Sequence, residues 1–109
     1  MAQSRATLAV VVAPQAVDDL AAIWRWNAEQ YSTSHADRYV DSLKLVIFGL
    51  GRSYWRGKPV SSRPDLRYIL VRRKRKSHGH VAVYRINGPT VEVLHVFHTA
   101  QDWQRKLTS

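Results

Sequence analysis

Histidines and one strand carboxylate are the residues of this chain that could carry acid–base chemistry. His95 and His98 lie three apart on a predicted strand, so their side chains point to opposite faces and cannot chelate one ion together. His78 and His80 could share a face, but no carboxylate or cysteine ligand lies near them in the sequence. We therefore expect no metal site and no cofactor. His98 lies where the last strand ends, beside Asp102. It is either a general acid or base or an imidazole held by the Asp102 carboxylate, and the second role is the commoner one for a lone histidine.

Cleavage of RNA would need a base, an acid and a cation for the phosphate, all on one face. The candidate catalytic residues are His98, Arg85 and Arg67. Glu92 is the only acidic residue in the predicted strands, and a cross-strand pair with an arginine is enough to explain it. The sequence thus assembles no convincing ribonuclease site, and we lean toward a protein that is not an enzyme.

A run of five cations occupies a predicted hairpin tip and consists of Arg72, Arg73, Lys74, Arg75 and Lys76. These side chains, with His98, are candidates for contact with a target or with nucleic acid. Each phosphate that they neutralise would make the binding affinity depend more steeply on salt concentration. The alternative is a solvated turn that protects a sheet edge from aggregation. The run alone does not decide between them.

The whole chain carries 17 lysines and arginines against 8 aspartates and glutamates, a net charge of +9 over 109 residues. That length predicts one domain over residues 1–109, with residues 1–6 expected to be flexible. The charge predicts an acidic partner, which could be a protein, nucleic acid or an anionic surface. The absence of cysteine excludes disulfides and thiol nucleophiles and fits a reducing cytoplasm. The apolar segment 6–13 is too short to span a bilayer, so we expect no membrane association.

Two helices and four strands are predicted to position these residues. Residues 8–12 form a strand that we expect to be buried on both faces or paired inside a sheet. Apolar residues at three- and four-residue steps predict helices over about 15–31 and 34–50, the second opened by a capping box at Ser34 and Asp37. Trp26 lies off the main apolar stripe with Ile23, which gives the first helix a second apolar face for the sheet or for a partner.

A connection without periodicity follows over residues 53–64. Strands are then predicted over 66–73, 80–86 and 90–97, with an Asn87-Gly88 turn between the last two, and a short helix over 100–107. Two amphipathic helices joined by few residues form a hairpin that must bury its stripes against a sheet. The fold class is therefore α+β, in the order β-α-α-β-β-β with a short C-terminal helix.

The order of these elements resembles the ParE branch of the RelE/ParE toxin superfamily of type II toxin–antitoxin pairs. The resemblance covers about residues 8–104. The matching residues are Ala16-Val17-Asp18-Asp19-Leu20-Ala21-Ala22-Ile23 with Tyr31, Ala36-Asp37-Arg38-Tyr39 with Leu43, Leu66-Arg67, Val83-Tyr84-Arg85-Ile86, and Val91-Glu92-Val93-Leu94-His95-Val96-Phe97-His98 with Gln101-Asp102.

The resemblance implies a helical hairpin packed on a small curved antiparallel sheet in a bacterial, cytoplasmic protein. It also implies a cognate acidic antitoxin, bound in a hetero-oligomer, whose disordered segment folds over the hairpin and the sheet. The residues expected to bind it are Leu20, Ile23, Trp24, Trp26, Tyr39, Leu43, Tyr84 and Arg85. The ParE branch is known for blocking DNA gyrase and the RelE branch for cleaving messenger RNA on the ribosome.

Departures from these patterns guide the choice of branch. Val81 stands where similar ribonucleases have an arginine, and Thr99 follows His98 where they often have a tyrosine. Gln101 stands where ParE patterns tend to have an arginine. The leading hypothesis is a plasmid-stabilisation-type toxin that binds gyrase. The alternatives are a ribosome-dependent endoribonuclease and a basic nucleic-acid-binding module.

Overall fold

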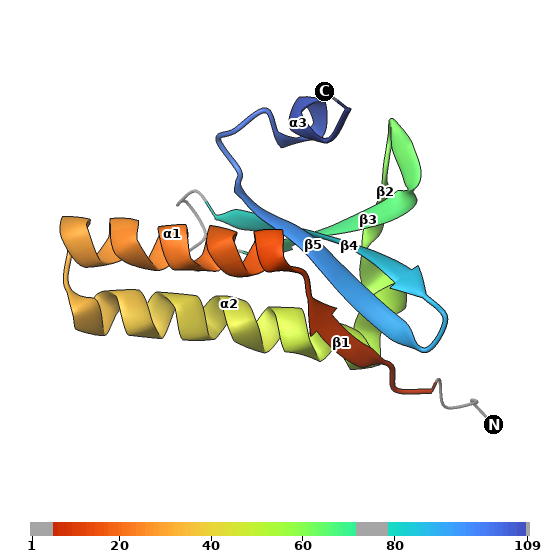
Figure 1. Cartoon of the computed structure of the whole chain (residues 1–109), viewed down its shortest axis with the longest axis horizontal. Coiled ribbons are helices and arrows are strands. Elements are labelled where there is room, and N and C mark those ends of the chain that lie inside the picture. The colour runs from red at the N-terminus through yellow and green to blue at the C-terminus, as the bar shows by residue number, and fades with distance from the viewer. Residues whose placement is uncertain (1–5, 72–78, 109) are drawn as a thin grey trace.

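A computed structural model describes residues 6–71 and 79–108 (Figure 1). The basic run at 72–76, His78 and all but the last residue of the stretch 1–6 lie outside the described residues. The elements are β1 (Ala9–Val12), α1 (Pro14–Gln30), α2 (Thr33–Ser53), the 3₁₀ turn η1 (Tyr54–Arg56), β2 (Lys58–Val60), β3 (Arg63–Val71), β4 (His80–Asn87), β5 (Thr90–His98) and α3 (Trp103–Thr108). The predicted fold class is confirmed.

The helical hairpin begins at Pro14, whose missing N–H has no partner in a first helical turn. The N-cap of α2 is Ser32, whose extended backbone lets its Oγ accept a hydrogen bond from the His35 N–H at 3.0 Å. The predicted capping box at Ser34 and Asp37 is therefore wrong, because the helix begins before Ser34. Asp37 instead accepts a hydrogen bond from Trp24 Nε1 at 2.8 Å, which ties α1 to α2.

The sheet is mixed, with strand order β1-β5-β4-β3-β2, and only the β1–β5 pair is parallel among the described strands. β1 pairs with β5 at one edge of the sheet and has alternating exposure, so the predicted pairing in a sheet is confirmed and the alternative of burial on both faces is wrong. The continuous Val10-Val11-Val12 run gives no sign of this alternation, although Val11 is half-exposed at the edge of the sheet. The sequence also missed β2, which has three residues and contains Pro59.

Two cores lie on opposite faces of the sheet. The helical hairpin packs on one face, where Leu43, Ile47 and Tyr84 are fully buried (Figure 1). On the other face, Trp103 of α3 covers Val81 and Val83. Side chains of β4 alternate between these cores, so each position on the strand has a defined face. Among the described residues no helix is both long and apolar enough to cross a membrane.

The far end of β5 lacks a neighbouring strand on its outer side within the described chain. β1 pairs with β5 only as far as Val93, and an irregularity in the β4–β5 register follows directly. Beyond it, the Val96 N–H donates to Asp19 Oδ2 of α1 at 2.9 Å, and the His98 N–H donates to Gln101 Oε1 at 2.9 Å. Side chains thus satisfy donors that a strand would otherwise pair, and they protect the edge.

Candidate functional site

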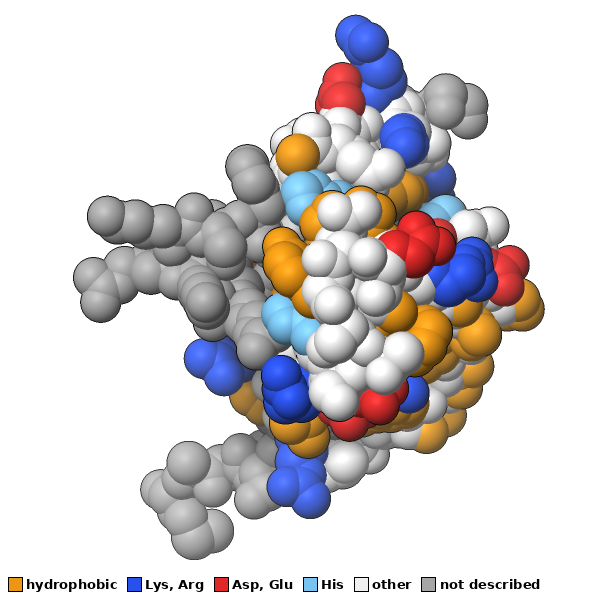
Figure 2. Space-filling model, turned by 90° about the vertical axis from the view of Figure 1, so that its left-hand side faces the viewer, with side chains coloured by type: hydrophobic (Ala, Val, Ile, Leu, Met, Phe, Trp, Pro, Cys, Tyr) orange, Lys and Arg blue, Asp and Glu red, His pale blue; other side chains and the backbone are white. Residues whose placement is uncertain are grey.

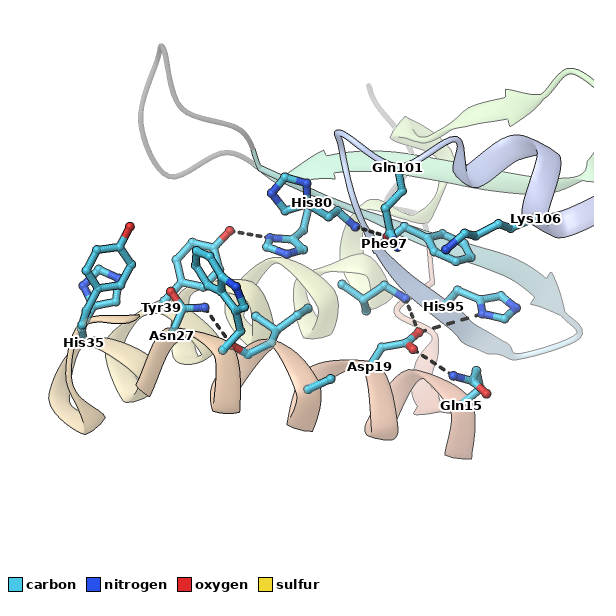
Figure 3. Close-up of a pocket in the computed structure, with 16 residues that line it drawn as sticks. Gln15, Asp19, Asn27, His35, Tyr39, His80, His95, Phe97, Gln101 and Lys106 are labelled. Atoms are coloured by element: carbon cyan, nitrogen blue, oxygen red, sulfur yellow. Dashed lines mark hydrogen bonds and ion pairs between the residues drawn. The ribbon is translucent and has the colours of Figure 1, made fainter. Parts of the chain in front are cut away.

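A groove of about 1150 Å³ lies between α1 and the open end of β5, with further walls from α2, β4 and the C-terminal segment (Figure 3). Four of the five histidines line it, namely His35, His80, His95 and His98. Figure 2 shows histidine and hydrophobic side chains gathered on this side of the molecule. We call it the aromatic–histidine groove.

A row of rings runs along this groove from the end of the hairpin to β5. Neighbouring ring centroids are separated by 6.1 Å for Trp26–Tyr31, 4.5 Å for Tyr31–His35, 6.5 Å for His35–Tyr39, 5.4 Å for Tyr39–His80 and 5.1 Å for His80–His98. Trp26 is 55% exposed at the outer end of this row. Aromatic rings with imidazole donors and acceptors suit an apolar ligand that also presents polar groups, such as a peptide.

The inner end of the row is a buried pair. Tyr39 Oη and His80 Nδ1 are 2.5 Å apart, and only 8% of His80 is exposed. Burial lowers the pKa of His80 from 6.5 to about 4, and the electrostatic interaction with His98 acts in the same direction. His80 is therefore neutral near pH 7, and its Nδ1 shares a hydrogen bond with the Tyr39 hydroxyl. This arrangement stabilises the groove floor and is poorly suited to proton transfer with a ligand.

His98 lies where β5 ends, as predicted. Its Nδ1 accepts a hydrogen bond from the Ala100 N–H at 3.0 Å, so the proton of the neutral ring is on Nε2. Asp102, the expected partner of His98, has an ion pair with Arg105 at 3.6 Å. The turn after β5 therefore orients the imidazole through backbone and amide contacts at His98, Ala100 and Gln101.

Asp19 is the only carboxylate among the described residues that line the groove (Figure 3). It accepts hydrogen bonds from Gln15 Nε2 and from the Val96 N–H, both at 2.9 Å, and lies 3.9 Å from His95 Nδ1. The Asp19 carboxylate thus holds α1 against β5.

In the β4–β5 pairing, His95 lies opposite Val83 and His98 lies opposite His80. Val83 and His80 point to opposite faces of the sheet, so His95 and His98 do as well, as the sequence predicts. Both line the groove because the groove follows the edge of β5.

The three ribonuclease candidates do not converge. Arg67 pairs with Tyr84 on the hairpin side, and its Nη1 donates to the Gly57 carbonyl at 2.8 Å. Arg85 follows Tyr84 on β4 and so points to the opposite face, where its Nε lies 2.7 Å from Glu92 Oε1. His98 pairs with His80, five residues along β4 from Arg85, or about 16 Å at ~3.3 Å per residue.

The expected antitoxin contacts fall into two groups. Ile23, Trp26 and Tyr39 line the groove, the last of them from a buried position. The other expected contacts lie outside the groove. Leu20, Leu43 and Tyr84 belong to the core beneath the hairpin. Trp24 donates a hydrogen bond to Asp37, and Arg85 forms an ion pair with Glu92 on the other face of the sheet. The sequence reasoning missed Asp19, Asn27, Tyr31 and His35 as lining residues. The four-residue spacing of His35 and Tyr39 on α2 was the available signal that these two share a side of the helix.

Nothing in the groove suggests a metal. Among residues 6–71 and 79–108, no group of three or more histidines, aspartates or glutamates is placed to hold an ion. The groove therefore has the character of a docking surface: a ring-lined floor, an exposed tryptophan at one end and a strand edge along one side.

Comparisons with known proteins agree with this fold. The family model described as "ParE toxin of type II toxin-antitoxin system, parDE" matches residues 10–103. A solved structure titled "Chromosomal ParDE TA system from P. aeruginosa" superimposes with a TM-score of 0.69 at 17% sequence identity, covering 86% of this chain and 98% of that one. At this identity the structural likeness shows a shared fold. No curated protein matches the sequence.

Proposed function

Because the chain belongs to the ParE toxin family of type II toxin–antitoxin systems, we propose that it arrests bacterial growth by binding DNA gyrase in the cytoplasm. We further propose that a cognate acidic antitoxin neutralises it by occupying the aromatic–histidine groove. The observation that carries the gyrase proposal is the family match over nearly the whole domain. The dispersal of His98, Arg85 and Arg67 favours action by binding over the alternative of RNA cleavage.

The antitoxin proposal rests on the shape and charge of the molecule. The groove exposes Trp26 beside Ile23, and burial of such apolar surface is the main source of affinity for a segment that folds on binding. The chain carries nine more positive than negative formal charges, so an acidic segment would also be attracted from solution. The one carboxylate in the described lining of the groove, Asp19, is held by hydrogen bonds from Gln15 and the β5 backbone.

A supercoiling assay tests the target. The purified chain should inhibit gyrase-catalysed supercoiling at micromolar concentration, and the product of the adjacent gene, added first, should abolish this inhibition. Supercoiling that stays unaffected while induced cells show codon-linked cuts in messenger RNA would overturn the gyrase proposal and favour the endoribonuclease.

Replacement of Trp26 with alanine should weaken antitoxin binding at least about tenfold, since loss of an exposed aromatic anchor commonly costs about 1–2 kcal/mol or more. The stability of the free chain should change little, because more than half of the Trp26 side chain is in solvent. Calorimetric titration of the two variants with the antitoxin measures the difference.

Ile86→Ala is a matched control for this experiment. Ile86 is also an exposed apolar side chain, but it lies on β4 outside the groove. Its replacement should leave antitoxin affinity within about twofold of the original chain. Equal losses from the two substitutions would place the antitoxin elsewhere.

A further inference from the structure

The outer side of α2 exposes large apolar side chains that the monomer does not use. Leu45 is 78% exposed and Phe48 is 55% exposed, although both lie in the middle of a 21-residue helix. α1 and the sheet cover one side of α2, and no described element packs on the other (Figure 1). Two such residues one turn apart form an apolar patch that a partner could bury.

A glycine beside this patch has no packing explanation among the residues that the structure describes. Gly51, two residues later, lies where a Cβ would come within 2.5 Å of the Leu8 carbonyl oxygen, so close packing of β1 requires it. A Cβ at Gly49 would meet no described atom within 4 Å, and the residue is exposed. Glycine in a helix interior costs about 1 kcal/mol relative to alanine. Close approach of another molecule to the helix at Gly49 would account for it.

The charges that flank the patch are arranged symmetrically along the helix. Asp41, Leu45, Phe48 and Arg52 fall at i, i+4, i+7 and i+11, so they form one stripe on the exposed side. An antiparallel copy of α2, related by a two-fold axis between Val46 and Ile47, would set Asp41 against Arg52 of the second copy and Leu45 against Phe48. The stripe is therefore self-complementary, as a two-fold interface requires.

From these observations we propose that the outer side of α2 is an interface between two copies of this chain, packed antiparallel across Leu45, Phe48 and Gly49. Lys44 then falls opposite Gly49 of the second copy, where the missing side chain leaves room for the aliphatic part of the lysine. The stripe itself bears one carboxylate and one guanidinium, whereas the whole chain has a surplus of nine positive charges. A neutral, self-complementary stripe fits a second copy better than it fits an acidic partner.

This interface leaves the aromatic–histidine groove open. Tyr39 and His35, which line the groove, lie on α2 away from the stripe. Each copy could therefore hold an antitoxin segment while the two toxins remain paired. The inference is independent of the proposed target and of the proposed antitoxin site.

Sedimentation equilibrium on the full chain tests the proposal. The chain should be a reversible dimer at micromolar concentration. Asp41→Arg and Arg52→Asp should each weaken the dimer at least about tenfold, because each sets like charges against each other across the two-fold axis. The double variant exchanges both charges and should regain the original dissociation constant to within about threefold. Both side chains are exposed, so neither single change should unfold the chain.

Gly49→Leu gives a second measurement that is independent of charge. The added side chain meets open space in the single chain, so circular dichroism should show the same helix content, but it should prevent close approach of the second helix. A chain that stays monomeric up to about 100 μM would overturn the proposal. A dimer that is unaffected by these four variants would equally overturn it, since the interface would then lie elsewhere.

Discussion

Gly57→Ala should destabilise the protein by about 3 kcal/mol, because a Cβ at this position would lie 2.1 Å from Tyr84 Oη and 2.7 Å from Tyr84 Cζ. The tyrosine cannot move aside easily, since it is completely buried in the core beneath the hairpin. Its hydroxyl also donates to the Tyr54 carbonyl at 2.8 Å and accepts from the Gly57 N–H at 2.9 Å. Relief of the overlap would break one or both hydrogen bonds.

Urea unfolding of matched variants measures this effect. Gly49→Ala makes the same chemical change in open space of the single chain and should stabilise the folded monomer by up to about 1 kcal/mol. Tyr84→Phe removes the oxygen that the new methyl group would strike, so the double variant Gly57→Ala/Tyr84→Phe should lose less stability than the two single losses added together. Additive losses would mean that the Tyr84 hydroxyl is not what excludes a side chain at Gly57.

The same contact gives Tyr84 and Arg67 a structural role that the sequence did not predict. From the sequence, Tyr84 was an expected antitoxin contact and Arg67 a ribonuclease candidate. In the structure they converge on the segment that joins α2 to β2, where Tyr84 binds the Gly57 N–H and Arg67 binds the Gly57 carbonyl. A motif confined to one strand cannot show a polar contact to a loop 10 or 27 residues away.

The elements themselves were more predictable than the site. Apolar steps of three and four residues and a proline predicted the hairpin, and Asn87-Gly88 predicted the β4–β5 turn, where Gly88 has a φ of +59°. These signals are local. The groove depends on where β1 ends relative to β5 and on the register irregularity after Val93, and both are properties of strand pairing over long sequence distances.

The second apolar face of α1 shows how far local pattern can go. Ile23 and Trp26 were expected either to be covered by the sheet or to be left for a partner. The structure leaves Trp26 mostly in solvent at the end of a row of rings, whose other members come from the α1–α2 turn, α2, β4 and β5. The sequence could therefore predict the residue but not the surface it belongs to, because that surface forms only after the strands pair.

Acid should destabilise the folded chain through His80 by about 3 kcal/mol between pH 7 and pH 4, in addition to the effect of the carboxylates. The pKa of His80 falls from 6.5 to about 4 in the folded state, and each pH unit of difference corresponds to about 1.4 kcal/mol. Above pH 6.5 the histidine is neutral in both the folded and the unfolded chain, so it does not change the free energy of unfolding. As the pH falls from 6.5 to 4, the unfolded chain takes up a proton that the folded chain resists, so stability decreases and the loss persists below pH 4.

His80→Gln isolates this contribution, since the glutamine amide can donate to or accept from the Tyr39 hydroxyl but does not titrate. Urea unfolding at several pH values should show the original chain losing about 3 kcal/mol more than the variant between pH 7 and pH 4. His98→Gln is the matched control, because the electrostatic interaction with His98 is only the second cause of the low pKa and burial is the first. It should therefore leave most of the acid sensitivity in place. Parallel stability curves for the original chain and His80→Gln would mean that His80 accepts a proton without loss of the fold, and the floor of the groove would then be open to solvent.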